Sequence, residues 1–319
     1  MTSAADAGRE SAGIVNVHHH FLPAFYMEAV AEKLAMGRGR QRAAGWSAES
    51  DVEQMDAAGI ARSIASISIP GLWFGDVDLS RRLSRDWNEF AAKVVSDHPG
   101  RFGFFAAIAP PDIDGALGEI RYAFDVLGAD GIGLMSSYDR RWLGDPAFAP
   151  VMRELDRRKA VVFVHPATVE EDAGPPGVKS HVLEGPFDTT RAVASLINEG
   201  VVAGCPNIRF IFAHGGGAIP FLGMRLATLT NGKPDFERDR LKSLFDRLYF
   251  DTALVINQAS IAALSAFSPA DHSLMGLDTP ILPAPREIAA WRSLSVDPDL
   301  RRRIERDNAL TLLRRQSDT

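Results

Sequence analysis

Cysteine is almost absent from this chain, in which Cys205 is the only one among 319 residues. A single thiol cannot form an intramolecular disulfide, so the composition fits a reducing compartment. Cys205 also precedes Pro206 in a loop-like stretch, a setting that argues against a catalytic thiol. The sequence therefore excludes a disulfide framework and speaks against cysteine chemistry.

Long apolar runs and basic stretches are missing as well. No apolar run reaches membrane-spanning length, and Met1–Ser11 lacks the basic-then-apolar pattern of a secretory signal. The formal net charge is −6, and the arginines at Arg301–Arg303 and Arg314–Arg315 lie in a late region of mixed charge, typical of a solvated helix face. We expect a cytoplasmic protein that has neither a nucleic acid nor a membrane as partner.

A G-x-G-x-x-G motif after the first strand is also lacking, which argues against a doubly wound open sheet. Instead, short apolar runs alternate with helix-like segments from end to end, as expected for strands buried on both faces of a parallel sheet. Eight such runs match the strand count of a closed (β/α)8 TIM barrel. The expected strands are Ile14–His18, Ser63–Ser68, Phe102–Ile108, Gly131–Met135, Val161–His165, Ile208–His214, Leu248–Asp251 and Ser273–Asp278.

Domain organisation and helix boundaries follow from the same pattern. We expect a polar N-terminal tail over residues 1–12 and a single barrel domain over residues 13–319. Helical periodicity marks Arg85–His98 and Thr189–Val202, the second after a cap at Thr189 or Asp188. Ser47 resembles a helix start, and Gly59 marks the end of that helix.

Three consecutive histidines end the first predicted strand. A strand projects alternate side chains to the same side, so His18 and His20 point together and His19 points away. The cluster is too short for a tag and lies within an apolar segment. Two imidazoles on one face suit a divalent metal, and we expect His19 to make hydrogen bonds behind the site.

Other polar residues end later strands. His165, His214 and Asp278 each follow an apolar run, and a closed barrel brings all strand carboxyl ends to one rim. We therefore expect one cation bound with an open position for water or substrate. Its ligands would be His18, His20, His165 and Asp278.

His214 has a different expected role. It is followed by Gly215–Gly217, which allows a ligand to approach the backbone closely. We therefore favour His214 as an acid/base or polarising residue rather than a ligand. The fourth strand ends at Met135 with neither lysine nor carboxylate to bridge a second ion, which predicts one metal and not two.

At this point the chain resembles the amidohydrolase superfamily, in the branch of aminocarboxymuconate-semialdehyde decarboxylase and the resorcylate decarboxylases. Four stretches carry the resemblance: NVHHHFLP (Asn16–Pro23), VHP (Val164–Pro166), FAHGGG (Phe212–Gly217) and GLDTP (Gly276–Pro280). Further stretches resemble a 6-methylsalicylate decarboxylase-like subgroup, namely Asp97–Phe105, Leu143–Pro146 and Pro186–Arg191.

The resemblance implies a function. It makes His18, His20, His165 and Asp278 the metal ligands, and His214 the catalytic histidine with Asp278 as the acid. It implies Zn²⁺, with Mn²⁺ as the alternative, and no organic cofactor. It also implies non-oxidative decarboxylation of a small hydroxylated aromatic acid, 6-methylsalicylate- or resorcylate-like, by a homodimer or higher homo-oligomer.

Two motifs depart from the family pattern. Asn16 stands where the family often has aspartate, so we expect weaker support for the ligands of the first strand. The eighth-strand motif, usually Gly-Ser-Asp followed by an aromatic residue, has Leu277 before Asp278 and Thr279 after it. We expect these two residues to stand beside the acid and to remove an aromatic wall.

Substrate contacts are the least specific expectation. Candidate pocket residues are Phe21, Trp46, Trp73, Phe74, Phe187 and Arg191, for which core packing or a surface salt bridge is the competing interpretation. Two other functions remain open at this stage. One is a hydrolase that cleaves a lactone, amide or C–C bond with the same mononuclear site, and the other is a barrel that only binds.

Overall fold

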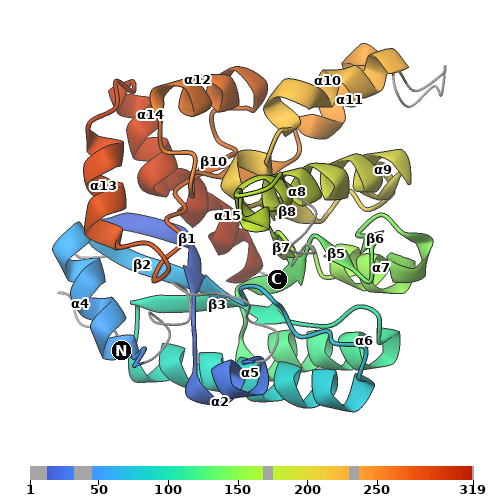
Figure 1. The fold of residues 1–319 in the computed structure, drawn as a ribbon, viewed down its shortest axis with the longest axis vertical. Coiled ribbons are helices and arrows are strands. Elements are labelled where there is room, and N and C mark those ends of the chain that lie inside the picture. The colour runs from blue at the N-terminus through green and yellow to red at the C-terminus, as the bar shows by residue number, and fades with distance from the viewer. Residues whose placement is uncertain (1–12, 32–44, 168–174, 230–236, 318–319) are drawn as a thin grey trace.

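Eight parallel strands form one sheet whose ends meet (Figure 1). The computed structural model describes residues 13–31, 45–167, 175–229 and 237–317. Val17 N donates to Met275 O at 2.9 Å and His20 N donates to Thr279 O at 2.7 Å, which closes the sheet into a barrel. The expected (β/α)8 fold is therefore confirmed. In sheet order the strands are β1 (Ile14–His20), β2 (Ile60–Ser66), β3 (Phe102–Ala107), β4 (Gly131–Met135), β7 (Val161–His165), β8 (Arg209–Phe212), β9 (Tyr249–Asp251) and β10 (Ser273–Leu274).

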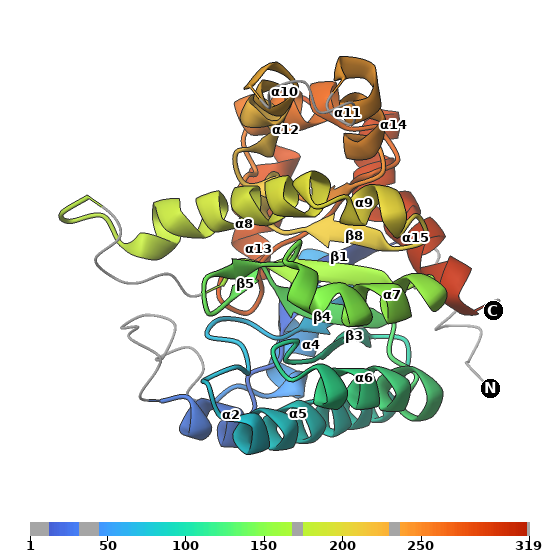
Figure 2. The same ribbon diagram turned by 90° about the vertical axis from the view of Figure 1, so that its right-hand side faces the viewer.

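Helices surround the barrel, with α5 and α6 along one side and α10 and α12 along the opposite side (Figures 1 and 2). The hairpin strands β5 (Ser137–Tyr138) and β6 (Arg141–Trp142) follow β4. The helices are α2 (Ala24–Ala29), α4 (Ala48–Ala58), α5 (Val77–Asp97), α6 (Ile113–Tyr122), η1 (Ala123–Leu127), η2 (Pro146–Phe148), α7 (Ala149–Arg157), α8 (Ser180–Asn198), α9 (Val201–Gly204), η4 (His214–Gly216), α10 (Ile219–Leu229), α11 (Arg238–Phe245), α12 (Gln258–Phe267), α13 (Ala284–Arg292), α14 (Pro298–Arg302), η6 (Arg303–Asp307) and α15 (Asn308–Ser317).

The last strand is shorter than expected, because β10 ends at Leu274 and not at Asp278. Gly276 lies so close to the preceding strand that an added Cβ would be 2.7 Å from Asp251 Cγ. The hydroxyl of Thr252 accepts from Gly276 N and donates to Gly276 O, both at 3.1 Å, so a side chain takes the place of the strand ladder. Asp278 therefore lies in a loop beyond the strand.

Helix boundaries agree with the sequence at α4 and differ at α8. The Ser47 side chain accepts from Ser50 N, and Gly59 ends α4 with a φ of 76°. The expected cap at Asp188 or Thr189 is wrong, because both residues lie inside α8, which starts at Ser180. The helix continues through Pro186, although a proline inside a helix removes one backbone hydrogen bond and crowds the preceding turn. The carbonyl of Pro186 accepts from the hydroxyl of Thr190.

The apolar core has two parts. One lies between the strands and the surrounding helices and includes the fully buried Trp87 and Trp291. The other joins residues of the strands to Leu312 and Leu313 of the C-terminal helix α15. The histidines described below lie at the carboxyl end of the strands, where the active sites of such barrels are found. Among the described residues, no helix combines the length and the apolar character that crossing a membrane would need.

Candidate metal centre

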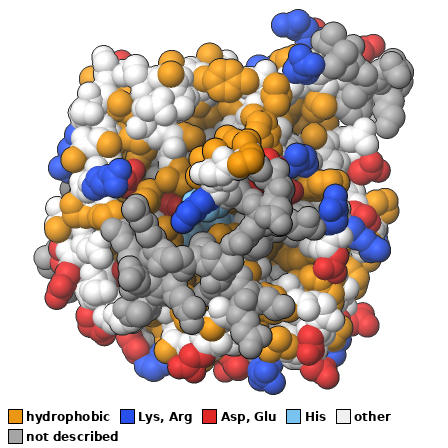
Figure 3. All heavy atoms as spheres, viewed as in Figure 1, with side chains coloured by type: hydrophobic (Ala, Val, Ile, Leu, Met, Phe, Trp, Pro, Cys, Tyr) orange, Lys and Arg blue, Asp and Glu red, His pale blue; other side chains and the backbone are white. Residues whose placement is uncertain are grey.

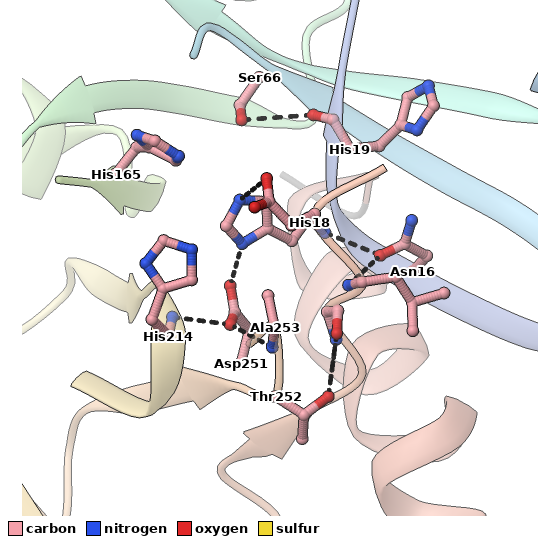
Figure 4. A network of polar contacts seen from close by, with 12 residues as sticks. Asn16, His18, His19, Ser66, His165, His214, Asp251, Thr252 and Ala253 are labelled. Carbon is pink, nitrogen blue, oxygen red and sulfur yellow. Dashed lines mark hydrogen bonds and ion pairs between the residues drawn. The ribbon is translucent and has the colours of Figure 1, made fainter. Parts of the chain in front are cut away.

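Strand β1 carries two histidines that meet a carboxylate. The Nε2 atoms of His18 and His20 are 3.2 Å apart, and they lie 3.3 Å and 3.1 Å from Asp278 Oδ1. All three side chains are buried. The ring of His19 lies on the other side of the strand, where it packs against Phe21, as strand alternation leads one to expect (Figure 4).

Two further histidines follow β7 and β8, which are neighbouring strands of the barrel. His165 ends β7, and His214 lies in the η4 turn two residues after β8. Their ring centroids are 5.7 Å apart, and that of His165 is 5.0 Å from the ring of His20. One ligand atom each of His18, His165, His214 and Asp278 lies within 4.8 Å of the others. The fold thus assembles four imidazoles and one carboxylate around a single centre.

These residues fit a divalent cation. Nε2 of His214 is buried and has no hydrogen-bond partner, which is costly for a polar atom unless something else binds it. Burial lowers the pKa of His165 well below its usual value and that of His214 to about 4, so both rings are neutral and keep a lone pair. Nitrogen donors with one carboxylate suit Zn²⁺ and Mn²⁺ alike. No second such group occurs in the described part of the chain.

Asp251, at the end of β9, braces the centre and was not predicted. Its Oδ2 lies 2.7 Å from His18 Nδ1, and its Oδ1 accepts from the backbone N–H of His214 and of Ala253 (Figure 4). Burial lowers the pKa of His18, but the charges and hydrogen bonds of Asp251 and Asp278 together outweigh it and raise that pKa to about 10. A carboxylate behind a metal-binding histidine fixes the ring and its tautomer. The available signal was a carboxylate that ends a predicted strand, the criterion that selected Asp278.

Asp278 is held as an anion. Burial would raise its pKa, but hydrogen bonds and charges from His18 and His20 keep that pKa well below its usual value. Its two neighbours stand beside it, as expected, and their side chains are engaged elsewhere. Leu277 is fully buried in the apolar core, and the Thr279 hydroxyl is engaged by other side chains.

Asn16 supports the first strand through four hydrogen bonds. Its Oδ1 accepts from the backbone N–H of His18 and of Leu277, each at 3.1 Å. Its Nδ2 donates to Thr279 Oγ1 at 2.9 Å and to Ser63 Oγ at 3.3 Å. The two donors and two acceptor positions of the amide are therefore all used, and weaker support than from an aspartate stays a prediction.

A segment of α8 contacts the backbone around both His165 and His214. The buried Asp188 accepts from Trp142 Nε1 and from the hydroxyls of Ser136 and Ser137. Ser136 N in turn donates to the carbonyl of His165 at 2.7 Å. Two residues further along α8, the Thr190 hydroxyl accepts from Ala218 N, in the turn that follows His214.

The predicted substrate-binding residues lie in varied environments. Phe21 is fully buried against Trp46, whose Nε1 donates to Asp51 Oδ2. Figure 3 shows that a histidine side chain is visible from outside near the middle of this face. Phe74 is partly buried, Trp73 donates to Asp139, Phe187 is 39% exposed and Arg191 lies 3.7 Å from Glu184. Their contact with a substrate remains a prediction.

A barrel with a buried His/Asp centre at the carboxyl ends of its strands defines a metal-site (β/α)8 protein. The sequence matches the amidohydrolase family over residues 15–315, and the chain belongs to this family. The expected resemblance is therefore confirmed.

Three known proteins illustrate the similarity. The decarboxylase yanB of Aspergillus niger is 33% identical, with 94% of this chain and 87% of that protein covered. The 6-methylsalicylic acid decarboxylase acuB of Aspergillus aculeatus is 34% identical, with 84% of each covered. A structure of 5-carboxyvanillate decarboxylase from Novosphingobium aromaticivorans, solved with manganese and 4-hydroxy-3-methoxy-5-nitrobenzoic acid, superposes with a TM-score of 0.84 at 20% identity. The superposition covers 96% of this protein and 97% of the decarboxylase. This last likeness concerns the fold.

Proposed function

We propose that this amidohydrolase is a metal-dependent, non-oxidative decarboxylase of a hydroxylated aromatic carboxylic acid, 6-methylsalicylate- or resorcylate-like. The observation that carries the proposal is the buried centre of histidines and Asp278 in a chain that is similar to decarboxylases over most of its length. One of those relatives acts on 6-methylsalicylic acid, a ring with a hydroxyl group beside its carboxylate.

The proposed ligands of the cation are His18, His20, His165 and Asp278, all of them buried, with His20 Nε2 3.1 Å from Asp278 Oδ1. His214 also belongs to the group of donor atoms within 4.8 Å of one another, and we assign it to proton transfer rather than to the cation. We propose Zn²⁺, with Mn²⁺ as the alternative, because the donor set accepts both and the carboxyvanillate decarboxylase structure contains manganese. A bound divalent cation supplies positive charge that attracts and orients the carboxylate and the adjacent ring oxygen of the substrate.

The protein's own residues then move a proton. Asp278, an anion in the structure, is the proposed acid: it takes the proton of the substrate's ring hydroxyl and delivers it to the ring carbon that bears the carboxylate, which interrupts aromaticity. The bond from that carbon to the carboxylate breaks, its electron pair returns to the ring, and CO2 leaves. His214 is the residue that we propose holds or passes this proton. No organic cofactor is required, because the ring itself accepts the electrons.

The test is incubation of the purified protein, with Zn²⁺ or Mn²⁺ present, with a panel of hydroxybenzoates that includes 6-methylsalicylate and 2,6-dihydroxybenzoate. We expect release of CO2 and of the corresponding phenol, with one proton from solvent at the former carboxyl carbon. Absence of both products across the panel would contradict the proposal. Incorporation of solvent oxygen into an acid product from a lactone or amide would favour the hydrolase instead.

The homo-oligomer and the cytoplasmic location remain predictions.

A further inference from the structure

The backbone of Asp278 adopts a left-handed conformation, with a φ of 53°. A residue other than glycine is seldom found there, so the surrounding structure must hold it. Both of its neighbours are tied to β1. Leu277 N donates to the Asn16 side chain at 3.1 Å, and the carbonyl of Thr279 accepts from His20 N at 2.7 Å. The strand that carries two proposed ligands thus also anchors the loop that presents a third.

A buried chain of side-chain hydrogen bonds supports these anchors. Asn16 Nδ2 donates to Thr279 Oγ1 at 2.9 Å, and His19 Nδ1 lies 2.7 Å from the same oxygen. Simple alternation would place residues 16 and 19 on opposite faces of a strand. The register between β1 and β2 shifts between Asn16 and His19, and this irregularity lets both side chains reach Thr279.

The hydrogen bonds of this network run in one direction, from Asn16 to Thr279 and from Thr279 to His19. Because Asn16 donates to Thr279 Oγ1, the hydroxyl proton of Thr279 is available for His19 Nδ1. The other ring nitrogen of His19, Nε2, lies 2.9 Å from Asp51 Oδ2. Both the His19 and Asp51 side chains are almost completely buried.

An aspartate at position 16 would reverse this order. It has acceptors for the N–H groups of His18 and Leu277, but no proton to donate to Thr279. Thr279 would then donate to position 16, and its hydroxyl proton would no longer be available for His19 Nδ1. The amide of Asn16 and the hydroxyl of Thr279 are therefore complementary, although the two residues are 263 positions apart.

We propose that Asn16, Thr279 and His19 are positioning residues that set the carboxylate of Asp278 against His18 and His20. The inference rests on the proposed function in that it concerns the same centre. It adds that the amide of Asn16 and the hydroxyl of Thr279 act as one hydrogen-bonded pair behind the ligands. None of the three residues needs to contact the substrate for this role.

Thr279→Val removes the hydroxyl at nearly constant size, and Thr279→Ser keeps it. Mutation of hydrogen-bond partners behind metal ligands typically costs about 10- to 100-fold in metal affinity or activity. We expect Thr279→Val to raise the dissociation constant for Zn²⁺ by that factor, measured by competition with a chromophoric chelator, and Thr279→Ser to remain within about threefold of the parent. The visible spectrum of the Co²⁺-loaded protein should change in the valine variant and not in the serine variant. An unchanged spectrum and Zn²⁺ affinity in Thr279→Val, or equal loss in both variants, would overturn the proposal.

Asn16→Asp is the second variant, should the valine variant fail to fold. It preserves size and both acceptors, and the negative charge that it adds would by itself favour cation binding. Loss of Zn²⁺ affinity would therefore come from the missing donor, whereas wild-type affinity would count against the proposal. Ser63→Ala is the matched control, because it removes only the longer contact to Asn16, and we expect wild-type Zn²⁺ affinity. Where a substrate is turned over, Thr279→Val should lower kcat with little change in KM. If no hydroxybenzoate is decarboxylated, the metal measurements still test the positioning role.

Discussion

The carboxylate of Asp251 lies 2.7 Å from His18 Nδ1, and its other oxygen accepts the backbone N–H of His214 at 2.9 Å. One side chain from β9 therefore holds both a proposed ligand and the proposed catalytic histidine. Its position explains how β9, which provides no proposed ligand, contributes to the centre.

Asp251→Asn keeps the shape of this brace and removes its charge. We expect the dissociation constant for Zn²⁺ to rise about 10- to 100-fold, because His18 loses the carboxylate that orients its ring. Chelator competition measures the change. Asp271→Asn is the control, since the Asp271 side chain is 67% exposed. A Zn²⁺ affinity within twofold of the parent would show that His18 does not depend on Asp251.

His214→Ala separates catalysis from metal binding. We expect one metal ion per chain to remain, while kcat for the accepted acid falls about 10²- to 10⁴-fold, the usual contribution of a residue that transfers a proton. Elemental analysis and steady-state kinetics measure the two effects, with His98→Ala as the control. Full activity would end the proposed role, and loss of the metal would make His214 a ligand.

Asp188→Ala tests the connection that α8 makes to the histidine-bearing loops. The substitution leaves Trp142 Nε1 and the hydroxyls of Ser136 and Ser137 without their common acceptor. Since a buried polar group left unsatisfied costs about 1–3 kcal/mol, we expect the free energy of unfolding to fall by about 2–4 kcal/mol in urea titrations. Asp86→Ala, on the exposed face of α5, should change it by less than about 0.5 kcal/mol. Equal stability of the two variants would contradict the interpretation.

Glu154 on α7 predicts a pH dependence of stability. Hydrogen bonds from Arg157 and, more weakly, from Arg158 lower the pKa of Glu154 from 4.5 to about 2, against the opposing effect of partial burial. A pKa that is lower in the folded state gives stability that is present above pH 4.5 and is lost as the pH falls towards 2. The parent should therefore exceed Glu154→Gln in unfolding free energy at pH 7, and the gap should narrow between about pH 5 and the acid limit of folding. A gap independent of pH over that range would exclude this ion pair as its source.

Much of the fold was predictable because each strand is a local pattern. The apolar runs that end in His18 and His165 predict burial on both faces of a parallel sheet, and the count of eight such runs favours a barrel with its polar residues at one rim. The expected strands at Gly131–Met135 and Val161–His165 agree residue for residue with β4 and β7. The helix that ends at Gly59 was equally local, because a cap and a left-handed glycine are decided within one turn.

Other features depended on contacts that no local pattern contains. The start of α8 was missed because Pro186 reads as a helix boundary, whereas the tertiary contacts of Asp188 favour a continuous helix. Asp251 was overlooked because a lone carboxylate at a strand end has no meaning until His18, 233 residues away, lies beside it.

Residue type and spacing along the chain by themselves determined the barrel, the rim on which chemistry occurs, and the histidines and the aspartate gathered there. The tertiary structure alone decided which side chains hold that group in place, as with Asn16 and Thr279. The reason is physical: burial and backbone periodicity act between near neighbours in sequence, whereas a hydrogen bond between distant strands exists only once the barrel closes and sets their register.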